Sequence, residues 1–152
     1  MGAPEVEAII RAAFAKTPMP KDSKLVNTYD DEGAQEYFGG RCWDGHSVED
    51  IRLQADAMSY FTPEAFRYYL PAFMLAELSD PEIADIVGEY VVSIFGPQPQ
   101  DLQSFQEERL SVMSSEEKLA VLHFIKYMQE EYGGFEVALG YFEGIVSDDR
   151  VS

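Results

Sequence analysis

The sequence predicts an all-α fold: a compact single-domain helical bundle around one kinked central helix. Apolar residues recur at helical spacing, start and stop signals separate the periodic segments, and no segment alternates like a half-buried strand. The periodic segments correspond to about six to eight helices of ordinary length. We expect residues 1–147 to form the domain and residues 148–152 to be a frayed acidic tail.

The central helix is predicted over residues 62–78. Thr62-Pro63-Glu64 supplies an N-cap, a first-turn proline and an acidic side chain at the positive end of the helix dipole. Apolar residues cover nearly all faces, as is typical of a buried helix. Pro71 removes the donor that would bond to the carbonyl of Arg67. We therefore expect a kink near Leu70, or two short helices meeting there.

Further helices are predicted from the same spacing over residues 4–15, 30–38, 48–60, 83–95, 101–109, 114–132 and 135–146. The sixth of these opens with a full capping box, Ser114 with Glu117, and ends at a glycine pair. Residues 21–28 are expected to be a loop with a short extended piece at 25–27. The proline-rich run 96–100 is the clearest loop in the sequence.

The charge balance is the most unusual property of the composition. There are 28 acidic residues against 11 basic ones, which gives a formal net charge of −17. Such a chain repels nucleic-acid phosphates and anionic membranes, so direct nucleic-acid binding is not expected. The same charge would steer a basic protein partner toward the molecule. The alternative is that the acidic surface only increases solubility.

The single cysteine, Cys42, excludes an internal disulfide and a thiolate metal cluster, and a reducing compartment is the simpler interpretation. The first residues lack a basic start followed by an apolar core, so no signal peptide is expected. No run approaches the roughly 20 apolar residues of a membrane helix. These features predict a cytoplasmic protein without a membrane segment.

Catalytic and metal-binding patterns are sparse. His46 and His123 are the only histidines, and His123 is interpreted as a structural residue beside the apolar face of its helix. Cys42 and His46 are close in sequence, but no third group is present to orient them as a nucleophile and base. Neither a Glu-x-x-His spacing nor a phosphate-binding glycine loop occurs. We therefore expect a non-enzymatic protein with no catalytic residues, metal or cofactor.

The first candidate binding surface is an acidic region that contains the only tryptophan. Its residues are Asp30, Asp31, Glu32, Trp43, Asp44, Glu49 and Asp50. A tryptophan among carboxylates is the composition of an interface anchor with a charged rim. The alternative is that Trp43 folds back as a lid on the core.

The second candidate is a small-molecule pocket near Pro71, lined by Arg67, Tyr68 and Tyr69. A proline in the helix frees a carbonyl group that could line such a pocket. The alternative is a packed core in which the tyrosine hydroxyls find partners at its edge.

Residues 61–73 contain the block Thr-Pro-Glu-Ala-Phe-Arg-Tyr-Tyr-Leu-Pro, which resembles the hallmark of a family of small bacterial proteins of unknown function. The segment 6–14, Trp43 and the segment 114–128 match the rest of the family pattern more loosely. The resemblance covers roughly residues 5–130 and implies a helical fold and a bacterial cytoplasmic setting. It implies no catalytic residues.

The predicted function is a non-enzymatic protein-interaction domain, most concretely an immunity or antitoxin protein that neutralises a basic partner. A nucleic-acid mimic is a variant of the same class. The alternative class is a small-molecule-binding protein or an unrecognised enzyme that uses the pocket near Pro71. A homodimer formed through residues 135–142 is compatible with either class.

Overall fold

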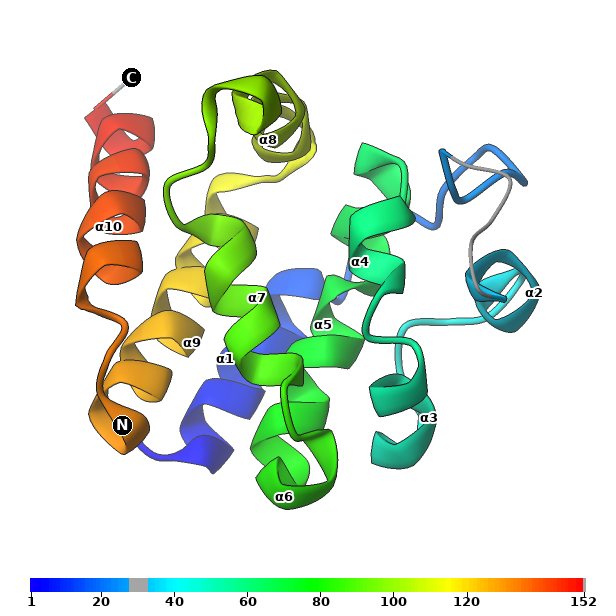
Figure 1. Ribbon diagram of the computed structural model, residues 1–152, viewed down its shortest axis with the longest axis horizontal. Coiled ribbons are helices and arrows are strands. Elements are labelled where there is room, and N and C mark those ends of the chain that lie inside the picture. The colour runs from blue at the N-terminus through cyan, green and yellow to red at the C-terminus, as the bar shows by residue number, and fades with distance from the viewer. Residues whose placement is uncertain (28–32, 152) are drawn as a thin grey trace.

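The computed structural model describes residues 1–27 and 33–151. Within them the all-α prediction is confirmed: no strand forms apart from a single antiparallel bridge between Val26 and Phe61. The helices, shown in Figure 1, are α1 (Ala3–Phe14), α2 (Ala34–Phe38), α3 (Val48–Leu53), α4 (Ala57–Tyr60), α5 (Pro63–Ser79), α6 (Pro81–Ala84), α7 (Val87–Phe95), the 3-10 helix η1 (Gln100–Leu102), α8 (Gln103–Val112), α9 (Ser115–Tyr132) and α10 (Glu136–Val151).

Helix α5 is the centre of the fold and contacts α1, α3, α6, α7 and α8. Thr62 caps it as predicted, because the Thr62 hydroxyl accepts a hydrogen bond from the Ala65 amide at 3.3 Å. The helix is continuous across Pro71, so the expected division into two short helices is wrong, and the kink is not confirmed. Burial of the residues around Pro71 offsets the one backbone hydrogen bond that the proline removes.

The described residues form ten α-helices, more than the six to eight predicted, because two expected helices are each divided in two. The segment 48–60 forms α3 and α4 with a turn between them, and the segment 83–95 contributes to α6 and α7. The second division occurs at Asp85, whose φ of 56° lies in the left-handed half of backbone space. Aspartate adopts positive φ more readily than most residues, but the sequence has no glycine or proline to mark this break.

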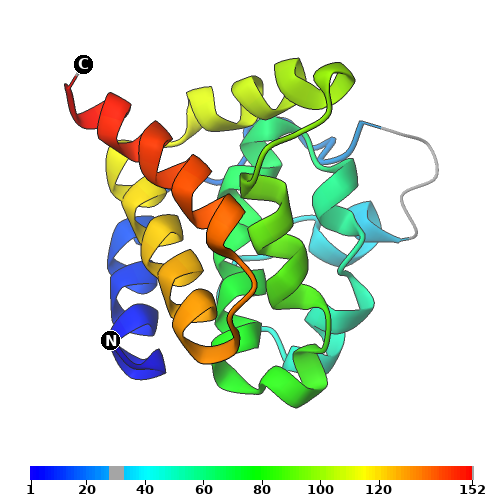
Figure 2. The same cartoon turned by 60° about the vertical axis from the view of Figure 1, so that its left-hand side comes forward.

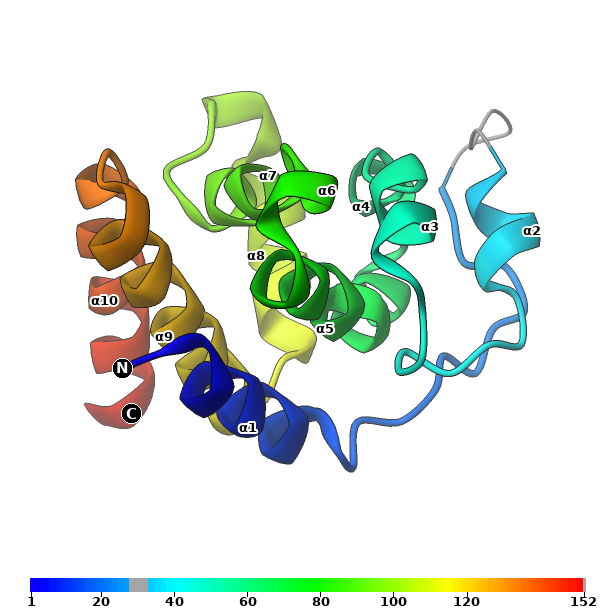
Figure 3. The ribbon, with the colours of Figure 1, turned by 90° about the horizontal axis from the view of Figure 1, so that it is seen from below.

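Helix α9 lies between α1 and α10, and α1 also packs against α5 (Figure 3). Helix α10 continues to Val151, four residues beyond the expected domain end at 147. Asp149 binds α9 there, accepting hydrogen bonds from the Ser115 hydroxyl at 2.5 Å and from Lys118 Nζ at 3.0 Å. Phe142 faces inward against Phe95, so a dimer contact through α10 would have to use its outward side chains instead.

An aromatic cluster fills the core between α2, α4 and α5. Phe38, Phe61, Tyr69 and Phe73 are buried, and the ring centroid of Phe38 lies 4.6 Å from that of Tyr69 and 5.3 Å from that of Phe61. The expected extended piece at 25–27 is confirmed, because the Val26–Phe61 bridge ties it to the chain just before α5. None of the helices in the described part of the chain has the length and apolarity that a bilayer crossing requires.

Candidate functional site

The predicted acidic region is divided by the structure. Trp43 is only 8% exposed and belongs to the hydrophobic core, so the lid interpretation is supported rather than the exposed anchor. Asp44 beside it accepts hydrogen bonds from Arg11 Nη1 and from the Gly45 amide, both at 2.9 Å. The hydrogen bond from Arg11 holds the pKa of the Asp44 carboxyl below its usual value. The candidates Asp30, Asp31 and Glu32 lie outside the described residues.

A small cavity of about 200 Å³ lies beside Trp43, between α1, α5 and the loop before α3. Its charged lining residues satisfy one another, because Arg11 binds Glu7 at 2.9 Å as well as Asp44. The cavity is therefore polar, but it offers no unpaired charge from this set to a ligand.

His46 holds this loop in place and is not available as a catalytic base for Cys42. Its Nδ1 lies 2.7 Å from the Tyr37 hydroxyl, and its Nε2 lies 2.7 Å from the main-chain carbonyl of Cys42. Because a carbonyl only accepts, Nε2 carries the proton and donates it. The imidazole thus contacts the Cys42 backbone, and not its thiol.

Glu49 and Asp50 are exposed in the first turn of α3, which Ser47 caps. Helix α3 is joined to the end of α6 by an ion pair between Arg52 and Asp85, at 3.3 Å. We call the exposed residues of these two helices and of the turn after α6 the α3–α6 surface and define it by Glu49, Asp50, Leu53, Glu82, Ile83, Asp85 and Ile86. Figure 1 shows the two helices.

Three large aliphatic side chains of the α3–α6 surface are left in solvent. Leu53 is 79% exposed, and Ile83 and Ile86 are also exposed. The ion pair between Arg52 and Asp85 joins the helix that carries Leu53 to the turn that precedes Ile86. Exposed aliphatic groups beside carboxylates are the composition of a protein interface.

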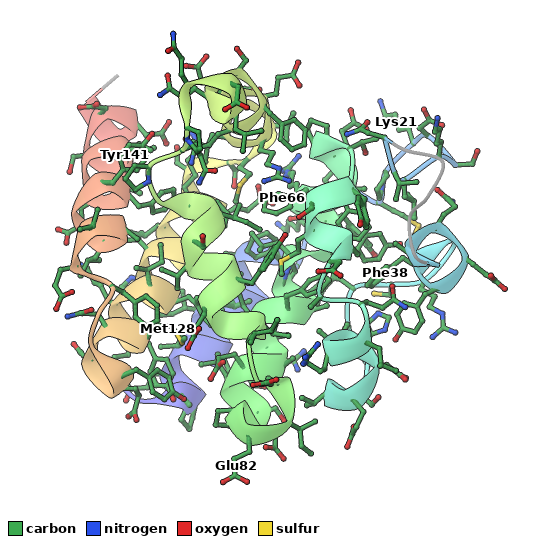
Figure 4. All side chains as sticks on the ribbon, in the orientation of Figure 1. Lys21, Phe38, Phe66, Glu82, Met128 and Tyr141 are labelled. Carbon is green, nitrogen blue, oxygen red and sulfur yellow. The ribbon has the colours of Figure 1, made fainter. Side chains whose placement is uncertain are left out.

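An acidic groove of about 260 Å³ adjoins this surface. It lies between the α6–α7 region and the end of α9, where Glu82 and Met128 are labelled in Figure 4. Its lining includes the carboxylates of Glu77, Glu82, Asp85 and Glu89. Glu77 is buried and accepts a hydrogen bond from the Tyr132 hydroxyl at 3.1 Å. It approaches Gly88 so closely that a Cβ there would lie 2.3 Å from its Oε1, which explains the glycine.

Burial raises the pKa of Glu77, and the hydrogen bonds from Tyr132 and the Gly88 amide only partly oppose this. The native state therefore binds a proton at a pH where the unfolded chain does not. Relative to Glu77→Gln, the wild-type protein should gain stability as the pH falls from 7 through the raised pKa. Urea unfolding over a pH series measures this difference, with Glu82→Gln as the exposed-carboxylate control. Parallel pH curves for wild type and Glu77→Gln would contradict the prediction.

The predicted pocket of Arg67, Tyr68 and Tyr69 does not form as one site. Arg67 Nε donates to Glu117 Oε1 at 2.8 Å, and Glu117 is 1% exposed. Tyr69 is buried, with its hydroxyl 2.8 Å from the main-chain carbonyls of Phe38 and Arg41. Tyr68 is also buried, which raises the pKa of its hydroxyl to about 12. These contacts match the alternative of a packed core with satisfied hydroxyls.

The sequence does not single out the groove residue Glu77, because an acidic residue within an apolar helix usually faces the solvent. The signal that could have revealed it is its position, since apolar residues surround it on nearly every face of α5. Ile83 and Ile86 belong to the apolar stripe that predicts a helix over residues 83–95. Their exposure follows from the turn at Asp85, which the sequence does not indicate.

The fold and these surfaces define a small all-α protein with an acidic, partly apolar face. The comparison with family patterns places it more closely: residues 3–133 match a family of unknown function, DUF6714, and the chain belongs to that family. Neither the curated proteins nor the solved structures gave a match.

Proposed function

We propose that the protein is a non-enzymatic interaction domain of the bacterial cytoplasm, which binds a basic protein through its α3–α6 surface. Its most concrete form is an immunity or antitoxin protein that neutralises a basic partner. The observation that carries the proposal is the exposure of Leu53, Ile83 and Ile86 beside carboxylates on that surface. A stable interface combines such an apolar centre with a charged rim, whereas charge alone gives only weak attraction.

The distribution of positive charge supports this proposal. Four of the basic side chains form ion pairs with carboxylates of the same chain; they are Arg11, Arg52, Arg67 and Lys118. Most carboxylates have no basic residue to neutralise them, because the chain has 28 acidic and 11 basic residues, and its net charge of −17 acts as an external negative field. Such a field accelerates the encounter with a basic protein, and the acceleration falls as salt is added.

The acidic groove offers a place for one cationic side chain of the partner. A lysine or arginine in it would meet carboxylates on several sides, with the Tyr132 ring and Met128 as apolar walls. Charge-assisted hydrogen bonds in such a partly enclosed site are stronger than those on an open surface. Glu77 at its wall is held by Tyr132 and is already positioned.

The test compares two double charge reversals in the tagged, full-length protein. Glu49→Lys/Asp50→Lys alters the α3–α6 surface, whereas Glu107→Lys/Glu108→Lys alters exposed residues of α8 at another end of the molecule (Figure 1). Both change the net charge equally. A basic protein should co-purify at low salt with wild type and with the α8 variant, and its affinity for the α3 variant should fall at least about tenfold.

Equal loss of the partner from both variants would show that general charge, and not this surface, binds it. Retention by both would also contradict the assignment. If double-stranded DNA releases the bound protein from wild type, the partner uses the same surface for nucleic acid. That outcome would support the nucleic-acid-mimic form of the proposal.

A further inference from the structure

Arg109 of α8 carries a buried positive charge. The side chain is 8% exposed and lies between two aromatic rings, with its guanidinium carbon 4.5 Å from the ring centroid of Phe66 and 4.2 Å from that of Phe105. Phe66 is labelled in Figure 4. One terminal nitrogen of Arg109 donates to the carbonyl of Met58 at 2.7 Å. Its Nε is buried and has no hydrogen-bond partner among the described residues.

No carboxylate of the described residues forms an ion pair with Arg109. Burial consequently lowers the pKa of its guanidinium to about 10. Stacking on aromatic rings returns only part of the free energy that removing an ion from water costs. The chain has 28 acidic residues, so the lack of a counter-ion here does not come from a shortage of acids.

Arg109 lines a cavity of about 260 Å³ formed by α4, α7, the loop after α7, η1 and α8. In Figure 2, α8 lies across one end of the molecule above α7. Hydroxyl, amide and apolar groups line the cavity beside Arg109, among them those of Ser59, Tyr90, Ile94, Leu102 and Gln106. No carboxylate of the described residues lines it.

The cavity wall is fixed by its own hydrogen bonds. The Gln106 side-chain amide donates to the carbonyls of Ile94 and Gly96, at 3.1 and 2.9 Å, and its oxygen accepts from the Tyr141 hydroxyl at 3.1 Å. The hydroxyls of Ser59 and Tyr90 are hydrogen-bonded to each other. The bond between the two hydroxyls uses only one of their two protons. The other proton can therefore be donated to a ligand oxygen.

We propose that this cavity binds a small organic carboxylate, whose oxygens accept hydrogen bonds from Arg109 and from the Tyr90 hydroxyl. One guanidinium matches one carboxylate in charge and in geometry. A phosphate dianion would remain undercompensated beside a single cation in a protein of net charge −17. Ile94, Leu102 and Phe105 supply an apolar wall for a short hydrocarbon part. The proposal does not depend on the basic partner of the α3–α6 surface.

Butyrate is the probe, and the resonance of the Arg109 Nε–H group, followed by NMR in the full-length protein, is the direct readout. We expect a saturable shift of this resonance with butyrate. The neutral 1-butanol and inorganic phosphate, each at the same ionic strength, should shift it far less. An equal response to 1-butanol would reduce the site to an apolar cavity and overturn the proposal. So would a stronger response to phosphate, or no response to butyrate.

Two variants connect the binding to the named residues. Tyr90→Phe removes one hydroxyl and should weaken butyrate binding about tenfold, whereas Tyr127→Phe, on α9, should leave it unchanged. Arg109→Gln should abolish the rise in unfolding midpoint that butyrate gives the wild type. If Arg109→Gln does not fold, the comparison of Tyr90→Phe with Tyr127→Phe decides alone. Equal binding by these two variants would contradict the role of Tyr90.

Discussion

The substitution Glu117→Ala should lower the free energy of unfolding by about 3 kcal/mol relative to the wild type, because it breaks a buried polar network. Glu117 Oε1 accepts from Arg67 Nε at 2.8 Å and from the Ser114 amide at 2.7 Å, and its second oxygen accepts from the Thr17 hydroxyl. The substitution therefore removes three interactions at once: the ion pair with Arg67, the capping-box bond from the Ser114 amide, and the hydrogen bond from the buried Thr17 hydroxyl. Arg67 keeps some access to water, which places the loss at the lower end of the range for buried pairs.

Urea unfolding measures this loss, and Glu116→Ala is the matched control. Glu116 is the neighbouring acid in the first turn of α9 and is exposed, so its removal should cost less than about 1 kcal/mol. Similar midpoints for the two variants would mean that the buried network adds no more stability than an exposed carboxylate at a helix start.

Much of the helical framework could be predicted because its signals are local. Thr62 caps α5, and Ser114 with Glu117 forms a capping box at α9, as the sequence indicates. The additional role of Glu117 could not be predicted. Its bond to Arg67 joins residues 50 positions apart, and it depends on how α9 packs relative to α5.

The candidate sites were predicted less well than the helices, for a physical reason. Whether Trp43 is an anchor or a lid depends on whether core volume remains for its ring, and the structure buries it. The pocket expected near Pro71 fails because Arg67 and Tyr69 find partners on other elements. Composition indicates which groups could bind a ligand, but only tertiary packing decides which of them remain unsatisfied, as Arg109 Nε does.

The two proposed sites differ in whether their charged groups are exposed to water. On the α3–α6 surface, carboxylates remain in solvent, where water stabilises them, and their effect on a partner is long-range and sensitive to salt. In the Arg109 cavity, a cation is removed from water without a counter-ion, so a bound anion would gain a strong short-range interaction. Salt should therefore weaken partner binding more steeply than butyrate binding.

Phe38→Ala should lower the free energy of unfolding by about 3–5 kcal/mol, as expected for a fully buried phenylalanine. The Phe38 ring contacts Phe61, Tyr69 and Phe73. It thereby connects the five-residue helix α2 to the centre of the fold. A helix this short has little stability of its own, so its position depends on this packing. Glu36→Ala, an exposed change on the same helix, should alter stability by no more than about 0.5 kcal/mol.

Two probes distinguish global from local unfolding in Phe38→Ala. Fluorescence of Trp43, the only tryptophan, reports on the segment after α2, and far-ultraviolet circular dichroism reports on all helices. Because Phe38 packs on α5, both urea transitions should move together to lower denaturant. If only the fluorescence transition moved, α2 and its flanking loop would be an independently unfolding unit. The aromatic cluster would then stabilise that unit and not the domain.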